Sequence, residues 1–132
     1  MNDASLQQLF TPAALNRLLP ASRSDNFFEA LFGDAAEGSY DIRLAFQGRN
    51  QSDNTLRFTL ELHERPGKCL ACNLTYGLPE VFSRHPGLNI AGVIKEIDAL
   101  LGEAANCADW RLGPTHQASK ALHTIPLIIS LA

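Results

Sequence analysis

The sequence predicts an α+β domain in which a predominantly antiparallel sheet packs against helices on one face. Three consecutive segments alternate apolar and polar residues, at 40–46, 56–62 and 70–76, a pattern typical of strands with one dry and one wet face. Helical patterns lie before and after this run of strands, and such segregation favours α+β over alternating βαβ units. A chain of 132 residues fits one domain, spanning 1–132.

Three short helical patterns precede the strands. Ser5 is placed to cap a first turn, and Thr11 followed by Pro12 is a typical helix start. Ser24 is expected to cap a third helix that ends at Gly33. The large apolar residues of this third helix recur at helical spacing and are all expected in the core: Phe27, Phe28, Leu31 and Phe32.

The alternating segments predict a three-stranded meander. A polar stretch at 48–54 separates the first two segments, which indicates an antiparallel hairpin. A turn at 65–68 leads to the third segment. Asn89 is then expected to cap a helix that ends at Gly102. Further strands are expected at 109–112 and 123–131.

The last of these strands is apolar on both faces. Ile125, Leu127 and Ile129 share one face, whereas Leu122 and Ile128 lie on the other. A second apolar face would meet water in a sheet with one helix layer, so we expect self-association as a homodimer with this strand at or near the contact. The alternative is that the N-terminal helices cover that face within one chain.

Composition limits the classes of partner and the compartment. The formal net charge of −3 and the absence of a basic stripe argue against nucleic-acid binding. We expect no membrane partner, because no apolar run is long enough to span a bilayer and the first twenty residues lack the basic region of a signal peptide. Three cysteines, an odd number, suit a reducing compartment, so the cytoplasm is the expected location.

Cys69 and Cys72 form the one short motif of the chain. Two such thiols could share a metal or carry out redox chemistry if they faced the same way. In a strand, residues three apart point to opposite faces, so we expect neither a disulfide between them nor a bound metal, and we expect all three thiols of the chain to be free. The alternative function is a small enzyme or a thiol or metal protein that uses this segment together with His63 or His85.

No catalytic residue is assigned from the sequence. A G-x-S-x-G segment and a glycine-rich phosphate loop are both absent, and no pair of carboxylates stands out by its spacing. We therefore expect no cofactor. The favoured function is a non-enzymatic binding or interaction module whose partner is a small ligand or a protein.

A shallow groove is expected on the wet face of the meander. The outward residues of the third segment are small, and longer side chains border them on the second strand. A concave surface with a few polar groups suits a ligand, whereas a covering helix would need small residues equally. The predicted ligand-binding residues are Arg57, His63, Cys69, Asn73 and Thr75.

Two segments resemble a small family of uncharacterised bacterial proteins: FFEALFGD at 27–34 and RPGKCLACNLTYGLP at 65–79. Some members of that family carry the name "pancreas/duodenum homeobox". The resemblance implies a bacterial, cytoplasmic protein and brings no activity with it. The chain itself has no W-F-x-N-x-R recognition pattern, and an acidic chain with several strands does not fit a three-helix homeodomain.

Overall fold

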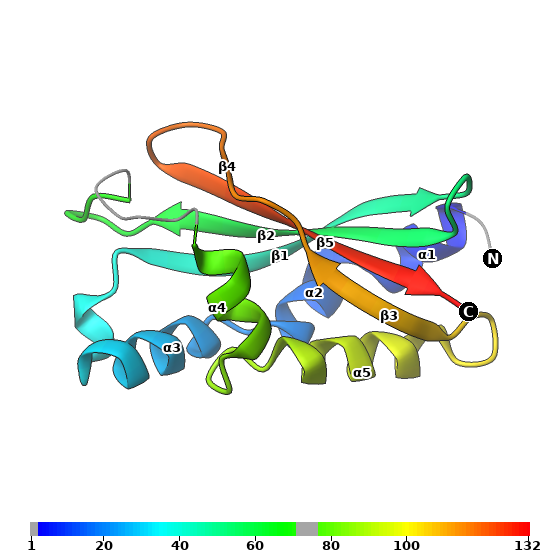
Figure 1. The fold of residues 1–132 in the computed structure, drawn as a ribbon, viewed down its shortest axis with the longest axis horizontal. Coiled ribbons are helices and arrows are strands. Elements are labelled where there is room, and N and C mark those ends of the chain that lie inside the picture. Colours follow the sequence, from blue (N-terminus) through cyan, green and yellow to red (C-terminus); the bar gives the residue numbers. More distant parts are fainter. Residues whose placement is uncertain (1–2, 71–76) are drawn as a thin grey trace.

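The structure is a computed structural model that describes residues 3–70 and 77–132. Within these residues one five-stranded sheet has the order β1-β2-β5-β3, and the short β4 also pairs with β5 (Figure 1). Every pairing is antiparallel, which confirms the predicted fold class. The strands are β1 Tyr40–Asn50, β2 Thr55–Glu64, β3 Cys107–Leu112, β4 His116–Gln117 and β5 Leu122–Leu131.

The β1–β2 hairpin forms as its alternation predicts. Ile42 lies opposite Leu62 and Leu44 opposite Leu60, so the apolar residues of both strands share one face. The register shifts between Phe46 and Gly48. Gly48 has a φ of 113°, a conformation that side chains disfavour, so glycine suits the bulge at this point.

The C-terminal strand β5 lies inside the sheet. It pairs with β2 from Thr55–Ser130 to His63–Leu122, and with β3 on its other side. The place beside β2 that a meander would give to its third strand is therefore occupied by β5. Of the predicted third strand, Leu70 is described and fully buried outside any strand, and 71–76 lie outside the described residues.

A proline within β5 is compatible with this central position. Pro126 lies opposite Thr59 of β2, and its carbonyl accepts a hydrogen bond of 2.8 Å from the Gly113 amide. Backbone groups alternate between the two edges of an antiparallel strand, so the missing N–H of Pro126 also points toward Gly113. Since β3 ends at Leu112, the proline interrupts no continuing ladder there.

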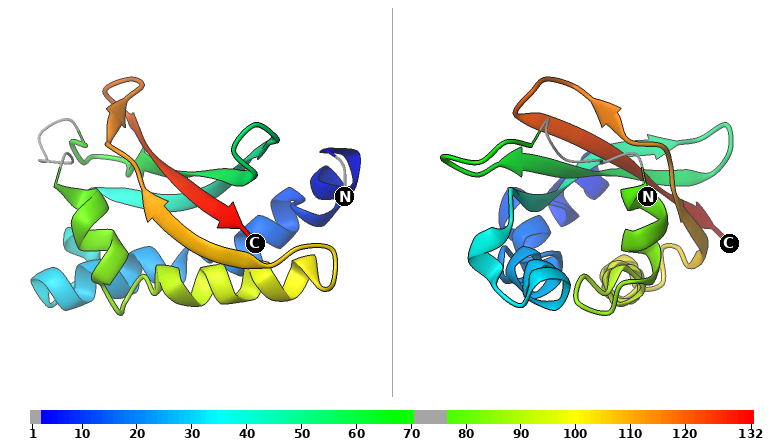
Figure 2. Two further views of the ribbon diagram at one scale, coloured as in Figure 1. Left: turned by 45° about the vertical axis from the view of Figure 1, so that its right-hand side comes forward. Right: turned by 60° about the vertical axis from the view of Figure 1, so that its left-hand side comes forward.

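The helices cover one face of the sheet (Figures 1 and 2). Their apolar residues and the inner sheet residues form one core, with Phe27, Phe58 and Phe82 among its largest fully buried side chains. Phe10 places its ring 4.9 Å from that of Phe46 and 5.0 Å from that of Phe58. The helices are α1 Asp3–Leu9, α2 Pro12–Leu18, α3 Ser22–Phe32, η1 Ala35–Glu37, α4 Leu78–Arg84 and α5 Ile90–Leu101.

Two expectations about α3 are wrong. The helix begins at Ser22, and Ser24 is a buried residue within it whose Oγ accepts a 2.8 Å hydrogen bond from the Ile42 amide of β1. Leu31 and Phe32 are each 54% exposed, because the end of the helix runs past the core. Phe32 instead stacks on Phe28, with ring centroids 6.0 Å apart.

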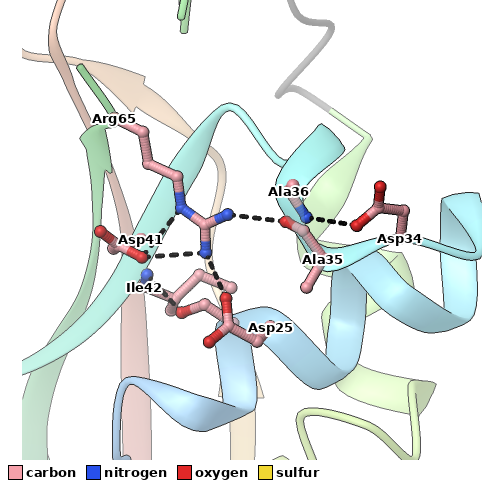
Figure 3. Close-up of polar contacts among 8 residues, drawn as sticks. Asp25, Asp34, Ala35, Ala36, Asp41, Ile42 and Arg65 are labelled. Atoms are coloured by element: carbon pink, nitrogen blue, oxygen red, sulfur yellow. Dashed lines mark hydrogen bonds and ion pairs between the residues drawn. The ribbon is translucent and has the colours of Figure 1, made fainter. Parts of the chain in front are cut away.

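Arg65, just after β2, joins three elements of the fold (Figure 3). Its guanidinium donates to Asp41 of β1 at 3.0 Å, to Asp25 of α3 at 2.8 Å and to the Ala35 carbonyl of η1 at 2.9 Å. The same group lies 5.3 Å from the ring centroid of Phe28, within the range of cation–π attraction. A planar fork of donors is needed to reach three acceptors in different directions.

Replacing Arg65 should destabilise the protein. We expect Arg65→Ala to lower the free energy of unfolding by about 1–3 kcal/mol, because charge-assisted hydrogen bonds are lost while water can still reach both carboxylates. Arg65→Lys should restore a minor part, since an ammonium lacks the fork. Urea unfolding measures the change. Arg84→Ala, which removes an exposed pair with Glu80, should cost under about 0.5 kcal/mol; equal losses at both positions would contradict the assignment.

His123 should make stability depend on pH. This residue of β5 is 3% exposed, and burial lowers its pKa below the ordinary value of 6.5. His123 therefore binds its proton at a higher pH in the unfolded chain than in the folded protein. As a result the free energy of unfolding falls as pH drops below about 6.5. Denaturation at a series of pH values should show this loss. His123→Gln should flatten that part of the profile, and an unchanged slope would contradict the prediction.

Candidate binding site

The face of the sheet away from the helices, called here the outer face, carries the polar residues of the strands. In the views of Figure 2 none of the described helices lies on this side. The registers place charged residues toward both ends of the face and half-buried uncharged residues across its middle. The middle group, called here the central strip, comprises Ala45, Thr59, Thr124 and Pro126.

Two of the predicted ligand residues lie on this face without meeting. Arg57 and His63 are six positions apart on β2, which separates them by about 20 Å in a strand. Each is already paired with a near neighbour in sequence. Arg57 donates to Asp53 at 2.8 Å, and His63 Nε2 lies 3.0 Å from Glu61 Oε1. They do not form a common ligand site.

The remaining predicted ligand residues lie beyond β2. Cys69 is exposed, is not part of a strand and is disulfide-bonded, so the expectation that its thiol is free is wrong. The expectation rested on strand alternation, and the described residues before 71 form a turn instead. Asn73, Thr75 and Cys72 lie outside the described residues, as does the groove that the small side chains were expected to form.

The expected apolar surface of β5 is largely buried within one chain. Ile125, Leu127 and Ile129 are fully covered beneath the sheet. On the outer face Ile128 is 9% exposed, because it lies between Arg57 of β2 and Arg111 of β3, whose long stems can cover an apolar neighbour. Burial on β5 therefore supplies no strong argument for a contact between subunits.

A groove of about 640 Å³ runs along the edge of the sheet that β1 forms, between this strand and the first two helices. This feature, called here the edge groove, is bounded by inner and outer residues of β1 alike, from Ile42 to Phe46. Apolar residues of the helix layer also line it, and Gln7, Asn16, Arg43 and Glu61 add polar groups. The sequence analysis missed it, because nothing in the local pattern of β1 shows which strand will have an open edge.

Backbone groups of β1 face this groove. The Ile42 amide bonds to Ser24 rather than to β2, and alternation then directs the N–H and C=O of Leu44 and Phe46 toward the same edge. No described residue forms a hydrogen bond with these groups of Leu44 and Phe46. Between α1–α2 and β1 the protein thus presents unpaired main-chain donors and acceptors.

The opposite edge of the sheet, at β3, is better protected. The Cys107 amide donates to Asp98 Oδ1 at 2.8 Å, and the Trp110 amide donates to Asp109 Oδ1 at 2.8 Å. Side-chain carboxylates thus satisfy two donors that β5 does not reach. Such capping makes an edge a poor template for another strand.

The titratable side chains of the described residues do not gather into a catalytic arrangement. His85 accepts from the Gly87 amide at 3.0 Å and packs on Phe27, a structural use. Burial raises the pKa of Tyr40 well above its ordinary value. In the described ranges no three His, Cys, Asp or Glu side chains are grouped to hold a metal ion.

Searches among protein families, curated proteins and solved structures find nothing that matches the chain. The resemblance at 27–34 and 65–79 accordingly stays a prediction. None of the described helices is both long and apolar enough to cross a membrane.

Cys107 should react slowly with alkylating agents. Burial first, and then the neighbouring Asp98, raise the pKa of its thiol to about 11 from an ordinary 9.0. The thiolate is the reactive form, so at mildly alkaline pH we expect iodoacetamide to modify Cys107 about a hundredfold more slowly in the folded protein than in denaturant. Mass spectrometry of the Cys107 peptide measures both rates. Equal rates would contradict the prediction.

Proposed function

We propose that this protein is a non-enzymatic binding module of a bacterial cytoplasm, acting through contacts with other polypeptides. The edge groove carries the proposal: an open strand edge with unpaired main-chain groups is a recognition surface, and it needs no reactive side chain. The scattered and mostly paired titratable groups support the same view.

A small enzyme or a thiol or metal protein remains the second hypothesis. The disulfide of Cys69 is the observation in its favour, because a bond on an exposed segment can be open to exchange. His63 or His85 was its expected partner. The His63 ring is engaged with Glu61, and His85 accepts a hydrogen bond from the Gly87 amide. Reduction potential and metal content of the purified protein would test this hypothesis directly.

Self-association is part of the proposal, with its location revised to the outer face. The central strip offers uncharged, half-buried residues from β1, β2 and β5. The face extends about 33 Å along β1, β2 and β5 and about 20 Å along the shorter β3. With strands about 4.8 Å apart it presents roughly 600 Å², less than the about 800 Å² per partner of a typical stable interface. A homodimer formed here is therefore expected to be weak and concentration-dependent.

A charge in the middle of the central strip should prevent the homodimer. Thr59 lies between Ala45 and Pro126, so Thr59→Arg would place a cation in the proposed contact without changing the helix layer. Light scattering across the micromolar range should show the mass of the parent protein rise with concentration and that of the variant stay monomeric.

Ala30→Arg provides the matched control, because Ala30 is exposed on α3 in the helix layer. That variant should associate like the parent protein. A parent protein that is monomeric at every concentration would exclude this homodimer, and equal effects of the two variants would show that general charge, rather than the strip, controls the mass.

A further inference from the structure

We propose that the edge groove binds an extended peptide segment of a partner protein, which adds to β1 as an antiparallel strand and carries acidic residues at its outward positions. This inference deepens the proposed function, since it names the class of partner. It rests on the backbone of β1, on the helix layer beside it and on one unpaired cation at the rim.

The backbone decides that the occupant is a strand. Leu44 and Phe46 each direct one donor and one acceptor into the groove at a spacing of two residues. Only an extended main chain repeats donors and acceptors at that spacing. Because the described strands of the sheet pair antiparallel throughout, and such ladders are slightly more stable per residue, we assign the same direction to the added strand.

The helix layer argues for a single segment rather than a second copy of this protein. Gln7 and Pro12 of the first helices and Asn16 of α2 border the groove together with the edge of β1. These helices therefore lie beside the space that a strand added to β1 would occupy. A second copy joined edge to edge would bring its own α1 and α2, which border its own β1, up against these helices, whereas an isolated extended segment brings none.

The rim supplies the charge preference. Arg43 lies on the outer face of β1, is exposed and forms no ion pair with a described residue, while its cross-strand neighbour Glu61 is engaged with His63. In an added antiparallel strand, residues that face outward lie next to Arg43, where an acidic side chain finds a partner. Residues that face inward lie over Phe10 and Leu15, where apolar side chains are favoured.

The test uses a short, end-blocked peptide of alternating valine and glutamate as the probe. Calorimetry with the full chain should detect binding, and amide NMR shifts should centre on Leu44 and Phe46 of β1. An otherwise identical peptide of valine and lysine should bind at least about tenfold more weakly. Shifts centred on Trp110 and Leu112 of β3, or no binding at all, would overturn the proposal.

Backbone methylation separates strand addition from attraction between charges. In antiparallel addition the inward valines direct their N–H groups to β1 and the outward glutamates direct theirs to solvent. Methylating the valine amides should abolish binding, whereas methylating the glutamate amides should leave it. If the valine-methylated peptide bound as tightly as the parent peptide, strand addition to β1 would be excluded.

Charge reversal at the rim completes the test. Arg43→Glu should weaken the valine–glutamate peptide by at least about tenfold and strengthen the valine–lysine peptide. Arg111→Glu makes the same change at the β3 edge, where Arg111 is also exposed, and should alter neither peptide. Equal effects of the two variants would overturn the assignment to β1. Self-association is measured independently at Thr59, so a failure here and a failure of the homodimer can be told apart.

Discussion

The pairing of β2 with β5 is the constraint on which the rest of the molecule depends. Thr55 to His63 align with Ser130 to Leu122, strands separated by most of the second half of the chain. This ladder closes a long loop before its contacts are made, and it puts the last strand at the centre of the sheet. The β1–β2 hairpin and β3 then become the two flanks, and the helices have one continuous apolar face to cover.

Once β5 is central, β1 and β3 form the two edges of the sheet. The two edges differ in how many of their outward main-chain groups are hydrogen-bonded to side chains. At β3, carboxylates of Asp98 and Asp109 take up free amides. At β1, Ser24 takes up the Ile42 amide, and the next residues along the edge keep their groups open. An open edge carries a risk of aggregation. The neighbouring first helices and the charged Arg43 restrict access to it, which is consistent with selective binding.

Several of the polar side chains form hydrogen bonds and ion pairs that hold elements of the fold together. Arg65 joins α3, η1 and β1 through three acceptors, and Asp53 holds both Thr55 and Arg57 at the hairpin turn. His85 shapes the turn before α5. Groups that are engaged in this way are poorly placed to take part in a reaction, and this is one reason for our proposal of recognition through main chain and shape.

The secondary structure could be predicted from the sequence to a large extent. Alternation located β1 and β2, and Asn89 and Gly102 located the ends of α5, because these signals act between near neighbours. The caps were less secure: Ser24 has the chemistry of an N-cap, yet it lies inside α3 and bonds to β1. A serine hydroxyl can cap a helix or bond to a neighbouring strand, and the tertiary structure around it decides which of the two it does.

What the sequence by itself determined was the class of fold, the dry face of each strand and the absence of an obvious reactive motif. The order of the strands was decided by tertiary structure, and the candidate site followed from it. Alternation predicts which residues face the core, but it carries no information on which neighbour a strand will take. The meander and the outer-face ligand site were both inferred from sequence adjacency. The edge groove exists because β5, rather than the segment after β2, completes the sheet and leaves β1 with one side unpaired.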